Sequence, residues 1–171
     1  MRLLGIDPSI TCTGYSIYDI EENNFLSYNY ITTKSLSNYF DKALLVSSEL
    51  FKEANMYSVD KIIFEGYAFG SRKFGGHNHN LIEFIGIIKY ILLSSYLGTL
   101  DDLIIIPPKT ARKLVLNNGN ADKEMIYNYF NTTYKLNFNP SSKIEKTRIQ
   151  NITDSMILCI AYKKQRSCDE K

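Results

Sequence analysis

Tryptophan is absent from this 171-residue chain, and cysteine, proline and histidine are rare, with three, four and two copies. The cysteines Cys12, Cys159 and Cys168 are odd in number and form no CxxC pair, so the sequence supports neither a disulfide framework nor a zinc site. A reducing compartment is the simpler interpretation, and we expect a cytoplasmic protein. His77 and His79 have no cysteine or further histidine to join them, which favours ordinary loop residues over metal ligands.

Long hydrophobic runs and linkers are also missing. No apolar run reaches the roughly 18 residues of a membrane span, because charged and serine residues interrupt the longest stretch, residues 81–97. Met1 and Arg2 lead directly into an apolar strand, which is not the pattern of a signal peptide. The chain has no internal repeat and no linker rich in proline, glycine or serine. We therefore expect one domain over residues 1–171 and no association with a membrane.

Net charge is low, at +2, but it is unevenly distributed. Residues 1–100 hold 8 Lys and Arg against 10 Asp and Glu, whereas residues 103–168 hold 11 against 4. A basic half of this kind is typical of nucleic-acid binding, although a solvated basic surface would give the same composition. The candidates for phosphate contact are Lys109, Arg112, Lys113, Lys143, Lys146 and Arg148.

Hydrophobic periodicity predicts three strands in hairpin succession, followed by alternating helices and strands. The expected strands are residues 1–7, 13–18, 24–31, 60–65 and 103–106, and the expected helices are residues 36–54, 81–97, 109–116, 122–130 and 147–166. Residues 131–146 are predicted to be mostly irregular. This order indicates an α/β protein with a mixed five-stranded sheet, three antiparallel strands and then two parallel ones, and helices on both faces. It is the order of the ribonuclease H-like architecture.

Two carboxylates stand at strand ends, Asp7 after the first strand and Glu65 after the fourth. Asn151 and Asp154 are three residues apart, hence on one face of the last predicted helix. A lone buried carboxylate is costly, so these side chains either accept hydrogen bonds from structural donors or meet to hold a cation. All-oxygen ligands favour Mg²⁺ or Mn²⁺, and Mg²⁺ in turn favours phosphate.

Residues 66–76 form a glycine-rich segment that carries aromatic and basic side chains. We expect a loop here, with two open alternatives for its aromatic residues: they pack back on the core, or they stack on nucleic-acid bases. The side chains concerned are Tyr67, Phe69, Arg72, Lys73 and Phe74.

Four segments of the chain, in order, resemble the RuvC-type Holliday junction resolvases, in particular the divergent kind found in bacteriophages and their relatives. The segments are Gly5-Ile6-Asp7-Pro8-Ser9 with Thr13-Gly14-Tyr15, Ile63-Phe64-Glu65, Asn118 to Lys123, and Asn151-Ile152-Thr153-Asp154-Ser155-Met156. Each is weak alone, but four in register over nearly the whole chain are fairly specific.

The resemblance implies that Asp7, Glu65 and Asp154 bind two Mg²⁺ ions, for which Mn²⁺ substitutes, with Lys123 near the scissile phosphate. Asn151 stands where the family has an aspartate or a histidine, and an amide brings neither charge nor a base. The implied reaction cuts a four-way DNA junction by paired nicks that leave 5′-phosphate and 3′-hydroxyl ends. The predicted helix over residues 81–96 is apolar enough to bury one side in the core and another against a twofold partner, so we expect a homodimer. Its compartment would be the bacterial host cytoplasm if the protein is phage-encoded.

Three other functions stay open from sequence. One is a broader endonuclease that also cuts Y-forks and flaps. A second is a junction-binding module without catalysis, which Asn151 makes conceivable. A third is an ATP-binding phosphotransferase of the actin and hexokinase type, whose first phosphate loop Gly5-Ile6-Asp7 resembles, although 171 residues leave no room for the second lobe.

Overall fold

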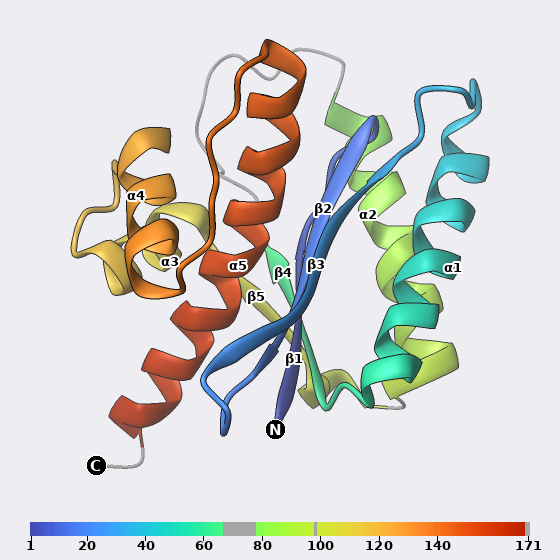
Figure 1. The fold of residues 1–171 in the computed structure, drawn as a ribbon. Coiled ribbons are helices and arrows are strands. Elements are labelled where there is room, and N and C mark those ends of the chain that lie inside the picture. Colours follow the sequence, from blue (N-terminus) through green and yellow to red (C-terminus); the bar gives the residue numbers. More distant parts are fainter. Residues whose placement is uncertain (67–77, 98, 170–171) are drawn as a thin grey trace.

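A five-stranded mixed sheet forms the centre of the protein, in a computed structural model that describes residues 1–66, 78–97 and 99–169. The strand order across the sheet is β3-β2-β1-β4-β5 (Figure 1). The strands are β1 (Arg2–Asp7), β2 (Cys12–Asp19), β3 (Asn24–Thr32), β4 (Lys61–Glu65) and β5 (Leu103–Ile106).

Strand directions confirm the prediction of a mixed sheet. The pairs β1–β2 and β2–β3 are antiparallel, whereas β1–β4 and β4–β5 are parallel. In the parallel pair Ile6 lies beside Phe64, so the next residues along, Asp7 and Glu65, leave the sheet at the same edge. Parallel strands bring their carboxyl ends together, and this is the edge at which ligand sites of open α/β sheets occur.

Helices cover both faces of the sheet (Figure 1). One face packs against α1 (Tyr39–Tyr57) and α2 (Asn78–Leu92), and the other against α3 (Pro108–Leu116), α4 (Lys123–Thr133) and α5 (Lys143–Asp169). A π-helical turn η1 (Leu93–Leu97) continues α2, and a 3-10 turn η2 (Leu100–Asp102) precedes β5. Within the described residues, no helix is both long and apolar enough to cross a bilayer.

The start of α5 is the largest departure from the sequence prediction. The helix begins at Lys143 rather than at residue 147, because Ser142 and Glu145 form a capping box. The Ser142 hydroxyl accepts from the Glu145 amide at 3.2 Å, and the Glu145 carboxylate accepts from the Ser142 amide at 3.2 Å. Lys143 and Lys146 therefore lie on a helix and not in an irregular loop.

Smaller corrections follow from the same local chemistry. Helix α1 begins at Tyr39 rather than residue 36, since the Asn38 side chain accepts from the Phe40 amide at 2.8 Å. Helix α4 begins at Lys123 rather than residue 122, since the Asp122 carboxylate caps it by accepting from the Met125 amide at 2.9 Å.

Two glycines allow α5 to lie directly on the sheet. A Cβ at Gly14 would come within 2.1 Å of the Asn151 carbonyl oxygen, and one at Gly5 within 2.3 Å of the Ser155 carbonyl oxygen. Both contacts are with helix backbone, which cannot move aside as a flexible side chain would. The close approach places Asn151 and Asp154, on the same turns of α5, against the edge where β1 ends.

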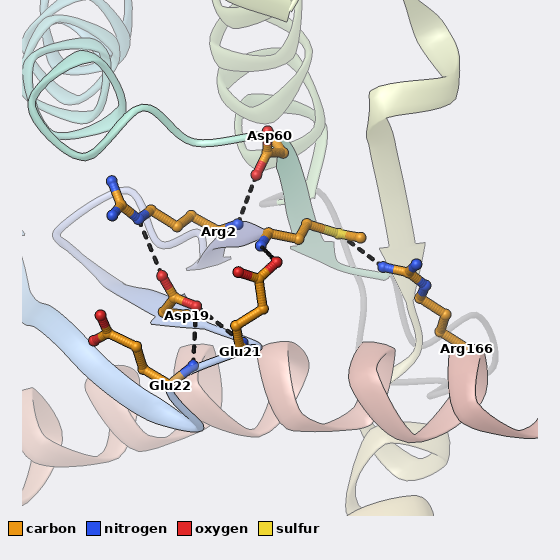
Figure 2. Close-up of polar contacts among 7 residues, drawn as sticks. Arg2, Asp19, Glu21, Glu22, Asp60 and Arg166 are labelled. Atoms are coloured by element: carbon orange, nitrogen blue, oxygen red, sulfur yellow. Dashed lines mark hydrogen bonds and ion pairs between the residues drawn. The ribbon is translucent and has the colours of Figure 1, made fainter.

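At the opposite end of β1, carboxylates have donors of their own (Figure 2). Asp60 accepts from the Arg2 amide at 2.7 Å, and Asp19 accepts from the Arg2 guanidinium at 3.1 Å. Burial raises the pKa of Asp19, but hydrogen bonds from the Glu22 amide and Arg2 outweigh it and hold that pKa below the usual value. Acids at this end are paired structural groups.

Candidate active site

Asp7 and Glu65 form a carboxylate pair at the edge where β1 and β4 end. Their carboxyl groups lie close enough to affect each other's pKa directly. Burial raises the pKa of Asp7 well above its usual value, and the adjacent charges of Glu65 and Asp154 raise it further. Burial also raises the pKa of Glu65. The two groups cannot both ionise cheaply unless a cation joins them.

Asp154 approaches this pair from α5. It is 8% exposed, and its negative charge acts on both Asp7 and Glu65. One carboxylate oxygen of Asp154 is held by Arg112 of α3, with the guanidinium Nη2 at 3.0 Å from Oδ1, and Gln150 donates to the other oxygen at 3.4 Å. Three acids distant in sequence thus share one region, with Asp154 in an ion pair.

Asn151 lies one helical turn before Asp154, and its amide nitrogen donates to the Cys12 carbonyl at the start of β2. This bond orients the side chain and leaves the amide oxygen as the atom able to act as a ligand. Its part in metal binding stays a prediction.

The donor chemistry of this region fits a divalent cation. Carboxylate oxygens suit hard ions such as Mg²⁺ or Mn²⁺, and the raised pKa values of Asp7 and Glu65 show that their ionised forms need a counter-charge. Over residues 1–66, 78–97 and 99–169, no three His, Cys, Asp or Glu side chains are clustered closely enough to hold a metal ion together. The match to a divalent cation therefore concerns Asp7 and Glu65. Asp154 is held instead by its ion pair with Arg112.

The predicted phosphate-contacting residues fall on the helices around this edge. Lys109 and Lys113 are exposed on α3 and line an open depression beside Gly119. Lys123 is the exposed first residue of α4, and Tyr127 one turn later lies close enough to Asp154 to be affected by its charge.

On α5, Lys143 and Lys146 are exposed, and the Arg148 guanidinium lies 4.6 Å from the centre of the Tyr30 ring. The loop candidates Tyr67, Phe69, Arg72, Lys73 and Phe74 lie outside the described residues.

Sequence reasoning treated Arg112 as one more cation for DNA and missed its bond to Asp154. It also missed Gln150, which contacts the same carboxylate. Gln150 is four residues before Asp154 on one helix, and this spacing could have predicted the contact. The Arg112 contact joins two helices far apart in sequence, so no local pattern could have indicated it.

Comparison with known proteins assigns the chain to a protein family. No family model matches the chain. The crossover junction endodeoxyribonuclease RuvC of Finegoldia magna is 30% identical over 141 residues, which cover 80% of this chain and 81% of that protein. The chain belongs to the RuvC family. This confirms the resemblance seen in the sequence.

Solved structures of the family agree on the fold. Thermus thermophilus RuvC superimposes with a TM-score of 0.76 at 13% identity, covering 99% of this chain and 97% of that one. The same protein in complex with a Holliday junction substrate gives a TM-score of 0.73 at 10% identity, covering 98% and 96%. The ribonuclease H-like sheet and helices expected from sequence are thereby confirmed.

Proposed function

We propose that this RuvC-family protein is a divalent-metal-dependent endonuclease that resolves four-way DNA junctions by paired, symmetric nicks. Membership in a family of crossover junction endodeoxyribonucleases supports the reaction class. The observation that carries the proposal on this chain is the adjacent Asp7–Glu65 carboxylate pair with Asp154 beside it, at the sheet edge where α5 crosses β1.

Asp7 and Glu65 would hold the metal, with Asp154 and the Asn151 amide oxygen as further ligands; we propose two Mg²⁺ ions, with Mn²⁺ as a substitute. Ions bound there would activate a water molecule as the nucleophile and offset negative charge on the leaving 3′ oxygen. Arg112 forms an ion pair with Asp154 and places a positive charge where a DNA phosphate would approach the carboxylates. Its Nε is buried without a hydrogen-bond partner in the described part of the chain, so it has a donor to offer.

A panel of labelled DNAs tests this function: a four-way junction, a Y-fork, a flap and a linear duplex, each with Mg²⁺ and with chelator. We expect paired nicks in opposed strands of the four-way junction, only with metal, leaving 5′-phosphate ends. Equal cutting of forks and flaps would indicate a broader debranching endonuclease rather than a junction resolvase. Tight junction binding without nicking in any metal would indicate a non-catalytic module.

Lys123 is proposed to offset negative charge that develops on the scissile phosphate. It is exposed and begins α4, so its removal has little to disturb in the fold. We expect Lys123→Ala to slow single-turnover junction cleavage by about 10²-fold and to change junction affinity by less than about threefold. Lys52→Ala, on the distant helix α1, is the matched control. A loss confined to affinity would make Lys123 a simple phosphate contact.

A homodimer would supply two such sites to the two strands of a four-way junction, whose symmetry is twofold. The face proposed for self-association is on α2, where Ile82 and Tyr90 are 46% and 72% exposed and a Cβ on Gly86 between them would meet nothing within 4 Å. These positions are four residues apart, hence on one side of the helix.

We expect Ile82→Glu and Tyr90→Glu to turn a dimer into a monomer in sedimentation equilibrium. They should also replace paired nicks in one junction by single nicks. Met56→Glu, at a residue that is 72% exposed on α1, is the control and should stay dimeric. A monomeric wild type, or a dimer that survives both α2 substitutions, would refute the assignment of this face.

A further inference from the structure

A small basic cavity lies next to the candidate active site, between the start of α5 and the ends of β2 and β3. Its volume is about 240 Å³. Among the residues that the structure describes, three cations and three hydroxyl groups line it and no carboxylate does: Lys34, Lys143, Arg148, Thr11, Thr32 and Thr147. Clustered positive charge is the recognition chemistry of a phosphate group, and here the three cations supply it. The Thr32 and Thr147 hydroxyls already donate to the carbonyls of Thr11 and Lys143.

The cavity is built on ordered backbone. Cys12 pairs with Thr32 across β2 and β3, and the Thr11 carbonyl accepts from the Thr33 amide at 3.2 Å. These bonds fix the strand-end segment that leads to Lys34. On the other wall, the Arg148 guanidinium lies against the Tyr30 ring at 4.6 Å, a stacked arrangement that limits the conformations of the arginine.

The cavity is close to the catalytic acids, along the same sheet edge. Cys12 lines it, and the carbonyl of Cys12 accepts the hydrogen bond from Asn151. Charges of Arg148, Lys34 and Asp7 all act on the Cys12 thiol. Asp7 lies beside Gly14 in the β1–β2 pair, and β3 is one strand further. Two strand spacings place the cavity roughly 10 Å from β1.

We propose that this cavity binds a backbone phosphate of the DNA strand being cut, other than the scissile one. A separation of roughly 10 Å corresponds to about one to three nucleotides along one strand. The contact fixes the strand as it passes over α5, so that the scissile phosphate lies at the carboxylates. The inference rests on the proposed nuclease function, and it adds Lys34, Thr11, Thr32 and Thr147 to the surface that sequence reasoning assigned to DNA.

The test combines charge removal on the protein with charge removal on the DNA. Lys34→Gln and Arg148→Gln each delete one positive charge from the cavity, and Lys52→Gln deletes one from α1 as the control. Lys34 is exposed, so Lys34→Gln should fold even if Arg148→Gln is destabilised by loss of the contact with Tyr30. Affinity is measured in chelator, against salt concentration, for junctions in which single phosphates near the cleavage site are neutral methylphosphonates.

We expect each cavity variant to lose about tenfold in affinity and to reduce the slope of log K against log salt by about 1, with no change for Lys52→Gln. One methylphosphonate position, a few nucleotides from the cut, should weaken the wild type and have little further effect on the cavity variants. Variants that match Lys52→Gln in slope and in sensitivity to every methylphosphonate would overturn the proposal.

Two further arms separate the alternatives. Inorganic phosphate is titrated onto the protein alone: saturable binding lost in Arg148→Gln, together with junction affinity equal to the control, would assign the cavity to a small free anion and overturn the proposal. The slope comparison is repeated on linear duplex, where cavity variants should again have a slope lower by about 1. If the slopes differ in this way but the protein nicks no junction, the proposed nuclease function is wrong and the phosphate site is still supported.

Discussion

Asp7→Asn should slow junction cleavage by at least about 10³-fold while junction affinity in chelator stays within about threefold of wild type. The amide keeps the shape of the side chain but removes a charged ligand from the Asp7–Glu65 pair. Single-turnover nicking of a labelled four-way junction measures the first quantity, and fluorescence anisotropy measures the second. A variant that cuts at more than about a tenth of the wild-type rate would show that Asp7 is not a metal-binding catalytic group.

The same substitution should stabilise the metal-free protein. Burial and the charges of Glu65 and Asp154 raise the pKa of Asp7, which means that its ionised form is disfavoured in the folded state. A carboxyl group whose pKa is raised by folding binds more protons when folded, so its cost to stability grows as the pH rises from the unfolded-state pKa toward the folded-state pKa. In chelator, the advantage of Asp7→Asn over wild type should therefore be small near pH 4 and grow toward about pH 7.

Two controls separate this effect from general damage. Asp101→Asn, at an exposed acid in η2, should change neither cleavage nor the pH dependence of unfolding by urea. Glu65→Gln should behave as Asp7→Asn does, because it removes the other member of the pair. Greater stability combined with lost activity is the pattern of a charged site built for function rather than for folding.

The second large effect concerns the contact between β2 and α5. Gly14→Ala places a Cβ within 2.1 Å of the Asn151 carbonyl oxygen and 2.7 Å of the Ile152 amide nitrogen. Because both atoms belong to helix backbone, α5 must move as a unit or the strand must bend. We expect the free energy of unfolding in urea to fall by roughly 3 kcal/mol or more, and the chain to cut junctions poorly because Asn151 and Asp154 are displaced from Asp7.

Gly86→Ala is the matched control, since a Cβ there meets nothing within 4 Å of the same chain. Alanine is the better helix former, so this change should raise the free energy of unfolding by roughly 0.5–1 kcal/mol. Both substitutions are made in the Tyr90→Glu background, so that contacts between copies at the α2 face do not contribute. A Gly14→Ala protein as stable as its parent would mean that α5 does not lie on β2 as closely as described.

The fold was largely predictable because its signals are local. The apolar run of β1, the alternating residues of β2 and β3, and the three- and four-residue spacing in the helices depend only on near neighbours. The order of elements then restricts the topology. The start of α5 was missed although Ser142 and Glu145 have the spacing of a capping box. The polar composition of residues 131–146 outweighed that motif in the prediction.

The candidate site was predictable only in part. Asp7 and Glu65 could be paired from sequence because parallel strands end at one edge. Asp154 could be singled out because it shares a helix face with Asn151, three residues before it. The Arg112–Asp154 ion pair, and the close approach of α5 to Gly5 and Gly14, depend on how two distant helices and a sheet pack together. These are tertiary contacts, which the hydrophobic periodicity of the sequence does not predict.

Anomalous diffraction from crystals of the wild-type protein soaked in Mn²⁺ measures most directly whether these acids form a metal site. We predict an anomalous peak between the carboxylates of Asp7 and Glu65 in the wild type, and its loss from Asp7→Asn crystals of the same form. Manganese that appears only at other surface carboxylates, or that occupies the site equally in Asp7→Asn, would contradict the account.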